Sequence, residues 1–348
     1  MVTLKEVAQM CNVSISTVSN ILNGKPKVSE ETKKRVLQVM QETGYQPNYF
    51  AQGMRKQKTQ IIGILAEDLH QFSSPGVIEG IMAYCESHNY RTVLENMRLY
   101  DRWGCSWYDQ EKLYDSVLEP ALQQLMSIKV DGIIYVAGHA RIINCFPEDF
   151  RLPAVVAYAY SGSRRFPSVV IDDEKGGYDI TRYLLENGHR KIGVIAGDRQ
   201  NIHTQKRALG YQKALFEDQL LFNPDWIQYG DWERQSGYEA AVKLLEDDVT
   251  AIFCMNELMA GGAYDYIYEH GLKPGTDISV VGYDNRELSG FFGPPLTTME
   301  IPLTTIGENA GRVLLRLLQA DKEEAKEEWG KEYLIPCKLI ERKSVLHI

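Results

Sequence analysis

Small polar side chains near the start of the chain are interleaved with an apolar pattern that suits two packed helices. Ser14 and Ser19 carry hydroxyls that can bind phosphate or the edges of bases. Ala8, Val13 and Val18 are small or apolar, so two helices can approach closely there. A helix fits the B-DNA major groove, which is about 12 Å wide, when a second helix holds it at a fixed angle. The spacing predicts a helix-turn-helix; a three-helix module that binds protein is the alternative.

Three short helices are expected in this part of the chain. Ser14 is a good N-cap for the second helix, because its hydroxyl accepts a hydrogen bond from an N–H of the first turn. Ser29 caps the third helix in the same way, and Gly44 ends it. The apolar side chains at helical spacing, which we expect to face inward, are Leu4, Val7, Ala8, Cys11, Val18, Ile21, Leu22, Val36, Val39 and Met40. The outward face of the second helix carries Ile15, Ser16, Ser19 and Asn20.

Charge is unevenly distributed along the chain. Residues 1–58 carry nine Lys or Arg against four Asp or Glu, a net charge of +5, and the remaining 290 residues carry −14 of a total of −9. A basic head on an acidic body indicates a polyanion-binding module joined to a part with another role. A basic, solvated surface with no partner is the alternative.

From residue 60 onward, short apolar runs alternate with longer amphipathic stretches. The alternation predicts an α/β fold of parallel sheets with helices on both faces, and 348 residues suffice for two or three units. The expected strands are 61–66, 92–94, 132–137, 154–157, 169–171, 192–196, 251–255, 278–282, 333–337 and 338–344. The expected helices are 76–88, 111–129, 175–187, 206–218, 236–245 and 257–270. Similar segments at 127–132 and 188–191 precede comparable strands, which indicates two similar lobes.

Composition and motifs exclude several classes of protein. The chain is 44% hydrophobic and 24% charged, which excludes a disordered or collagen-like chain. No apolar run approaches the roughly 18–20 residues that span a bilayer, and the start lacks the pattern of a signal peptide, so we expect a cytoplasmic protein without membrane contact. Six scattered cysteines favour reduced thiols over a zinc site or disulfides. Glycine-rich phosphate loops and the Gly-x-Ser-x-Gly motif are absent, so we expect no cofactor, no metal and no enzymatic activity.

Further short motifs follow the helix-turn-helix residues in a characteristic order. They lie at 28–32, 44–48, 51, 130–134, 188–192, 210–211, 260–262, 280–284 and 295–298. Together they make the chain resemble the lactose-repressor (LacI/GalR) family of bacterial transcription regulators along essentially its whole length. The resemblance implies a helix-turn-helix headpiece, a hinge helix and a two-lobed core like the periplasmic binding proteins, built of doubly wound parallel sheets.

The resemblance also implies domain boundaries. We expect the DNA-binding headpiece at 1–47, the hinge helix or linker at 48–59, and the effector-binding and dimerisation core at 60–348. The expected lobes of the core are about 60–160 with 290–320 for the first, and about 161–289 with 321–348 for the second.

The second helix of the headpiece is expected to read the operator. The resemblance implies base contacts from Ile15, Ser16 and Asn20, with Ile15 on a thymine methyl and Asn20 on adenine N6 and N7. Ser14, Thr17 and Ser19 are expected at phosphates, although packing inside the headpiece is an equal alternative for Thr17.

The hinge carries a departure from the family. Met54 stands where the family places an apolar side chain, usually Leu, in the minor groove, and it is flexible enough to wedge between base pairs. Asn48 and Ala51 fit the hinge pattern, and Arg55 is expected to neutralise a phosphate. Gly53 weakens the helix when it is free of DNA. A solvated tail is the alternative for the basic end of this segment.

The resemblance places a small-molecule site between the two lobes, usually for a sugar or a nucleobase. Sugars need paired donors and acceptors for their hydroxyls and an aromatic face for the ring. The matching positions are Phe72 and Ser74 in the first lobe and Arg207, Trp232, Asn256 and Asp284 in the second. We expect a carbohydrate effector. Structural alternatives are a turn cap for Asp284, an acidic helix neighbour for Arg207, and the core for Trp232.

Several departures leave the ligand itself open. His70–Pro75 replaces the family's Asn-Pro-Phe-Phe, with His70 expected at the surface or behind the site. Asp172-Asp173 replaces Asp-Asn, and Glu257 replaces an Asp. The aromatic segment 100–108 is a lid on the ligand, a part of the dimer face, or a packed surface turn.

The sequence therefore predicts a cytoplasmic transcription regulator, a repressor, that binds double-stranded DNA at a pseudo-palindromic operator. Its operator affinity would depend on the effector's different affinities for two lobe arrangements. No leucine heptads follow the last strands, so a homodimer is expected rather than a tetramer. A solute-binding protein for transport would need a signal peptide and no basic head. A catabolite regulator that pairs with a phosphorylated carrier protein remains an alternative within the class.

Overall fold

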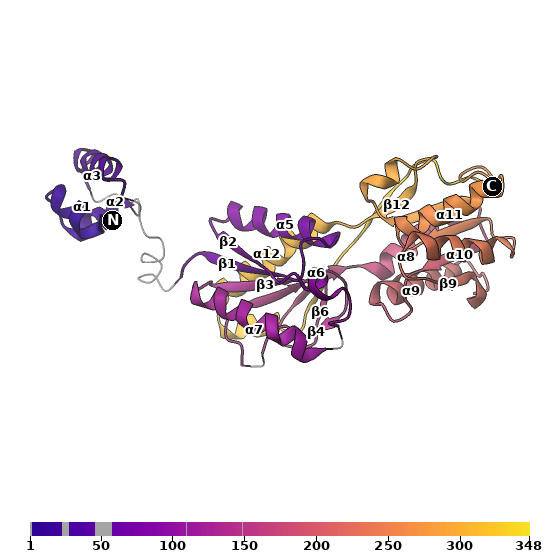
Figure 1. The fold of residues 1–348 in the computed structure, drawn as a ribbon, viewed down its shortest axis with the longest axis horizontal. Helices are drawn as coiled ribbons and strands as arrows, with labels where there is room; N and C mark the ends of the chain where they lie inside the picture. The colour runs from indigo at the N-terminus through magenta and orange to yellow at the C-terminus, as the bar shows by residue number, and fades with distance from the viewer. Residues whose placement is uncertain (1, 23–27, 46–57, 109, 148) are drawn as a thin grey trace. The chain divides into compact units, whose positions relative to one another are not determined.

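The computed structural model describes residues 2–22, 28–45, 58–108, 110–147 and 149–348, which form two compact units that divide between Gln60 and Ile61 (Figure 1). The expected hinge contacts Asn48, Ala51, Met54 and Arg55 lie outside the described residues.

The first unit is the headpiece. Its helices are α1 (Leu4–Met10), α2 (Ile15–Leu22) and α3 (Glu30–Thr43). The Ser14 hydroxyl accepts a hydrogen bond from the Thr17 N–H at 3.1 Å, and the Ser29 hydroxyl accepts one from the Thr32 N–H at 3.3 Å. Gly44 ends α3 at a φ of 63°, where L side chains are disfavoured. Side chains from all three helices share one core: Val7, Ala8, Cys11, Val18, Ile21, Val36 and Met40.

The first lobe of the second unit contains a six-stranded sheet in which all neighbouring strands are parallel. Its strand order is β13-β7-β5-β3-β1-β2. The strands are β1 (Ile61–Ala66), β2 (Arg91–Asn96), β3 (Gly132–Val136), β5 (Ala154–Ala157), β7 (Ser168–Ile171) and β13 (Glu332–Ile335). The main helices are α5 (Ser73–Ser87), α7 (Glu111–Ser127) and α12 (Leu303–Gln319), with the shorter α6 (Leu99–Trp103) and α13 (Lys322–Glu327). A two-stranded sheet of β4 (Ile142–Ile143) and β6 (Tyr160–Ser161) lies beside it.

Alternate residues of β1 face opposite sides of the sheet, as strand geometry requires. Ile64 packs in one buried cluster with side chains of α5 and α12, and Leu65 packs in another with Leu125 of α7. Helices α5 and α12 cross so closely that a Cβ at Gly80 would lie 2.0 Å from the Thr304 carbonyl oxygen. This crossing fixes the start of α5, which contributes to the site described below.

The second lobe contains the other six-stranded sheet. Its order is β14-β12-β11-β10-β8-β9, parallel except for the antiparallel edge strand β14. The strands are β8 (Ile192–Ala196), β9 (Ile227–Tyr229), β10 (Ala251–Cys254), β11 (Ser279–Asp284), β12 (Thr297–Glu300) and β14 (Lys338–Ile340). The helices form two pairs, α8 (Asp173–Glu186) with α9 (Ile202–Glu217), and α10 (Arg234–Leu245) with α11 (Glu257–Glu269).

The chain passes between the lobes after β7, after β12 and after β13. These crossings correct the expected lobe boundaries: residues 161–171, α13 and β13 belong to the first lobe, and β12 belongs to the second. The apolar runs that predict strands do not reveal which sheet a strand joins, because that choice depends on long-range pairing. Within the described residues, no helix is long and apolar enough to cross a membrane.

Candidate nucleic-acid interface and interlobe ligand site

The outward face of α2 carries one exposed apolar side chain among polar ones. Val18 and Ile21 are buried in the headpiece core, which turns Ile15 and Ser16 outward. Ile15 is 39% exposed although it is apolar, and Asn20 is half-buried. No acidic residue lies in the first turn of α2, so the positive end of the helix is free to attract phosphate.

Ser14 caps the start of α2 with its side-chain hydroxyl. Its hydroxyl lies 2.7 Å from the Ser16 hydroxyl and 2.8 Å from the Thr17 hydroxyl, in addition to its bond from the Thr17 N–H. The three hydroxyls therefore form one cluster at the helix start. Such a cluster holds the three hydroxyls in fixed positions.

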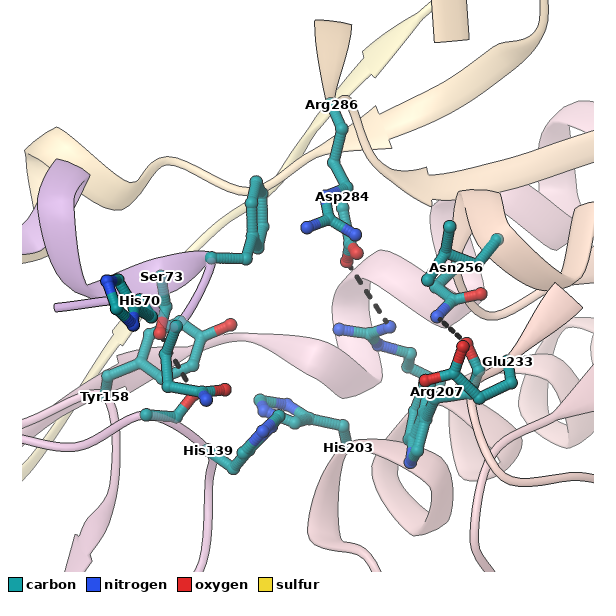
Figure 2. Close-up of a pocket in the computed structure, with 15 residues that line it drawn as sticks. His70, Ser73, His139, Tyr158, His203, Arg207, Glu233, Asn256, Asp284 and Arg286 are labelled. Carbon is teal, nitrogen blue, oxygen red and sulfur yellow. Dashed lines mark hydrogen bonds and ion pairs between the residues drawn. The ribbon is translucent and has the colours of Figure 1, made fainter. Parts of the chain in front are cut away.

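The second site is a cavity of about 290 Å³ between the two lobes, called the interlobe site below. Its walls follow the carboxyl ends of strands in both sheets, the usual place for ligands in α/β proteins. The first lobe contributes His70, Gln71, Phe72, Ser73, Gly138, His139 and Tyr158. The second contributes His203, Arg207, Trp232, Glu233, Asn256, Leu258, Asp284 and Arg286. Figure 2 shows the labelled members of the two groups facing each other across the cavity.

Arg207 is the central cation of the interlobe site. Its Nε donates to Asp173 at 2.8 Å and its Nη1 donates to the Met255 carbonyl at 2.5 Å, while the guanidinium lies 3.6 Å from the centre of the Tyr283 ring. Burial opposes the charge, but Asp173 and other neighbours raise the pKa of Arg207 above its ordinary value. The guanidinium is therefore charged and rigidly oriented.

His203 shares the carboxylate of Asp173. Its Nδ1 lies 2.7 Å from that carboxylate, and its Nε2 accepts a hydrogen bond from the Ala140 N–H at 3.2 Å. Since a backbone N–H can only donate, Nε2 is the acceptor in this contact, and Nδ1 faces the carboxylate. Burial opposes the charge on Asp173, yet His203 and Arg207 hold the pKa of this carboxyl below its usual value.

Asp284 and Glu257 form a pair of carboxyl groups with different charge. Burial raises the pKa of Glu257 to about 9, with a further contribution from Asp284, so Glu257 is neutral at pH 7. Burial raises the pKa of Asp284 only to about 6, because Arg207 and Arg286 oppose the shift. Asp284 is therefore charged at pH 7, and its Oδ1 lies 4.0 Å from Nη1 of Arg207. Its φ of 106° is a strained conformation of the kind found at functional sites.

Aromatic rings line two sides of the interlobe site. Arg286 of the second lobe lies 4.5 Å from the centre of the Phe72 ring of the first lobe, so a cation–π contact bridges the cavity. The backbone carbonyl of Trp232 accepts a hydrogen bond from Asn256 at 2.8 Å, and the indole covers Gly197, where a Cβ would lie 2.0 Å from the ring. Asn256 therefore orients Trp232 as well as lining the cavity.

Residues 3–48 match the family described as bacterial regulatory proteins, lacI family, and residues 181–345 match the periplasmic binding protein-like domain. The HTH-type transcriptional repressor PurR of Aliivibrio salmonicida is 33% identical over 323 residues, which cover 92% of this chain and 93% of that protein. The chain belongs to the LacI family. The ribose operon repressor of Haemophilus influenzae is 30% identical over 93% of this chain and 94% of its own. The solved structure of the lac repressor dimer bound to operator and the anti-inducer ONPF covers 99% of both chains with a TM-score of 0.78 and 27% identity.

These relatives are transcriptional repressors, so membership of the LacI family makes this chain a regulator rather than an enzyme. Among the described residues, no group of three His, Cys, Asp or Glu side chains is placed to hold a metal ion.

Five of the six effector residues expected from the LacI-family resemblance line the interlobe site: Phe72, Arg207, Trp232, Asn256 and Asp284. The sixth, Ser74, does not, and this expectation was wrong. Ser74 is fully buried, because successive residues of a helix point about 100° apart and α5 begins at Ser73. Ser73 lines the cavity instead and donates to the Gly138 carbonyl at 3.0 Å.

Sequence reasoning missed several further residues at the interlobe site of this LacI-family chain, among them His139, Tyr158, His203 and Arg286. His139 is neutral, since burial, together with His203, lowers its pKa to about 4. His70 was expected at the surface or behind the site; its side chain is 81% exposed, and it also lines the rim of the cavity.

The aromatic segment 100–108 lines no part of the interlobe cavity and supports one of its walls from behind. The buried carboxylate of Glu67 pairs with Arg141 and accepts hydrogen bonds at 2.7 Å from the Gly138 N–H and from the Tyr135 hydroxyl. Tyr100 donates to the same carboxylate at 3.3 Å, and the Arg141 guanidinium lies 4.4 Å from the centre of the buried Trp107 ring. The segment is thus a packed scaffold for loop 138–141 rather than a lid.

Proposed function

We propose that this chain is a homodimeric transcriptional repressor whose affinity for a pseudo-palindromic operator is set by a carbohydrate bound in the interlobe site. The observation that carries the proposal is the combination of two sites in one chain. An outward-facing helix with an exposed apolar side chain suits the major groove, and a polar cavity walled by both lobes suits a small ligand. The solved lac repressor, a dimer bound to operator, supports the dimer and the DNA partner.

Operator reading belongs to α2 in this proposal. Ile15 contacts a thymine methyl, while Ser16 and Asn20 contact the polar edges of bases. Ser14, Thr17 and Ser19 lie toward the phosphates, where the hydroxyl cluster at the helix start positions the backbone of the operator.

The polar groups of the interlobe site favour a carbohydrate. A donor from Arg207 and an acceptor from Asp284 stand 4.0 Å apart, a spacing that suits neighbouring hydroxyls of a sugar ring. The indole of Trp232 offers a flat face for the apolar side of the ring. A nucleobase is the second candidate, because the Phe72 ring and the planar guanidinium of Arg286 beside it offer flat surfaces for a planar ligand.

The effector acts through the relation between the lobes. A ligand that touches both walls stabilises the arrangement in which Phe72 meets Arg286 and Ala140 meets His203. It changes operator affinity only by its different affinity for that arrangement and for a more open one.

Operator binding is tested by footprinting on genomic fragments at several salt concentrations. We expect a two-fold symmetric protected site and an affinity that falls steeply with salt, since phosphate contacts release counterions. Removal of residues 1–58 should abolish this binding. Operator affinity that survives the truncation would contradict the role given to α2.

The effector class is tested by thermal shift of the full chain with sugars, sugar acids, sugar phosphates and purines. We expect a sugar to raise the melting temperature, and we expect Asp284→Asn to lose the response while it still binds operator. Asp248→Asn is a matched control, because Asp248 is 90% exposed and lies outside the cavity. A response to purines alone would replace the carbohydrate by the nucleobase.

A further inference from the structure

A second cavity, of about 340 Å³, lies in the first lobe and is called the basal pocket below. It is bounded by the residues that precede β5 and β7, by the end of α12, and by α13 with the turn that follows it. These segments meet at the amino ends of the strands, whereas the interlobe site uses the carboxyl ends. The two cavities are therefore at opposite edges of the first sheet, and the volume of the basal pocket falls in the range of small-ligand sites.

The charged lining of the basal pocket has one sign. Arg151, Arg165, Lys322 and Lys326 line it, and no Asp or Glu among the described residues does. Lys326 is paired with Glu323 at 2.7 Å, but for Arg151 and Lys322 no ion pair is found in the part of the chain that the structure describes. A concave surface lined by several cations concentrates anions, even on a lobe that belongs to an acidic core.

The rest of the basal pocket is apolar. Phe166 and Leu317 are 4% and 9% exposed and form part of its floor, while the indole of Trp329 remains 47% exposed at its side. The open indole of Trp329 extends the apolar floor toward the mouth of the pocket. An indole face stacks well on a flat ring.

We propose that the basal pocket is a second small-molecule site, for an organic anion that carries a phosphate or carboxylate group on a flat ring. The ring lies against Trp329, and the anionic group lies between Arg151 and Lys322, where charge-assisted hydrogen bonds are strongest. The basal pocket does not share residues with the interlobe site, so this proposal is tested independently of the function proposed above.

The test is a titration of the full chain, labelled with ¹⁵N in its tryptophan indoles. The sequence has five tryptophans; Trp329→Phe identifies the signal of Trp329, and the signal of Trp232 reports on the interlobe site. The probes are 1-naphthyl phosphate and 1-naphthoate, with inorganic phosphate as the anion alone and 1-naphthol as the ring alone. We expect both ring-bearing anions to shift the Trp329 signal to saturation, with affinity at least about tenfold higher than either partial probe.

Charge-reversal variants test whether the probe binds in the basal pocket or is attracted non-specifically by positive charge on the protein surface. Arg151→Glu combined with Lys322→Glu should weaken binding of 1-naphthyl phosphate by about tenfold or more, whereas Lys112→Glu, at an exposed lysine of α7, should leave it unchanged. The proposal is overturned if the chemical shift of Trp329 does not change while that of Trp232 does. It is also overturned if 1-naphthol binds as tightly as the two anions, or if the double charge reversal weakens binding no more than Lys112→Glu. Saturation by only one of the two ring-bearing anions narrows the ligand to phosphate or to carboxylate.

Discussion

His203, on the second lobe, accepts a hydrogen bond at 3.2 Å from the backbone N–H of Ala140, on the first lobe. Its other ring nitrogen is held by Asp173, the same carboxylate that orients Arg207. One imidazole therefore joins the wall of one lobe to the charged pair of the other. Contact between the lobes and orientation of the ligand-facing guanidinium are coupled through a single side chain.

Replacement of this imidazole should weaken both the fold and the ligand site. His203→Phe keeps a ring of similar volume but removes both nitrogen contacts. We expect the free energy of unfolding to fall by about 1–3 kcal/mol, because buried polar groups lose their partners. We also expect weaker effector binding, since the lobe arrangement that the ligand stabilises becomes less favourable. Denaturant unfolding and calorimetric titration measure the two effects. His347→Phe, at an exposed histidine, should change neither the free energy of unfolding nor effector affinity. If His203→Phe is destabilised but binds the effector normally, the contact between His203 and Ala140 does not contribute to effector binding.

The exposed face of α2 gives a prediction about DNA. Ile15→Ala and Asn20→Ala should each lower operator affinity by about 1–3 kcal/mol, the usual worth of a base contact, with little change in the salt dependence. Leu37→Ala is a matched control, because Leu37 is a 46% exposed apolar side chain on α3. Competition binding with altered operators measures the effect. If Ile15→Ala weakens all sequences equally, its side chain does not read a base.

The carboxyl pair gives a pH dependence. A charged Asp284 accepts hydrogen bonds from ligand hydroxyls, and burial raises the pKa of Asp284 to about 6. Effector affinity should therefore be constant from about pH 7 to pH 8 and fall as the pH drops through 6, approaching about tenfold per pH unit. Glu257 stays neutral over this interval, because its pKa is raised to about 9. Titration calorimetry across the interval measures the slope. Asp284→Asn should bind weakly and without this slope; an equal slope in the variant would assign the titration to another group.

Local patterns carried much of what the sequence could predict. The caps at Ser14 and Ser29 and the outward face of α2 depend on neighbours a few residues apart, and the structure confirms these caps. Arg207 and Asp284 were placed by resemblance to the LacI family, and both line the interlobe site.

What the sequence did not reveal depends on long-range geometry. His203 lies 63 positions along the chain from Ala140, and no local sequence pattern near either residue predicts the contact. The sequence predicted Ser74 at the cavity, but Ser73 lies there. A shift of one residue at the start of a helix moves a side chain from the cavity wall into the core. The lobe membership of β7 and β13 depends on pairing between strands far apart in the chain.

The Glu67–Arg141 pair should control the ligand site without touching the ligand. Arg141→Met leaves the carboxylate of Glu67 buried without its cation, which we expect to cost about 3–5 kcal/mol of unfolding free energy. Loop 138–141 should shift, because Glu67 also accepts a hydrogen bond from the Gly138 N–H. Effector affinity should therefore fall, although Arg141 does not line the cavity.

A second substitution distinguishes this account from simple loss of stability. Glu67→Gln combined with Arg141→Met removes both charges, so the double variant should recover part of the unfolding free energy that Arg141→Met loses. Its effector affinity should stay low, because Gln has only one acceptor oxygen for the donors that Glu67 binds on two. Arg164→Met, at an exposed arginine of the same lobe, should match the parent chain in both measurements. Full effector affinity in Arg141→Met would show that loop 138–141 keeps its position without the pair, and the aromatic segment would then serve packing alone.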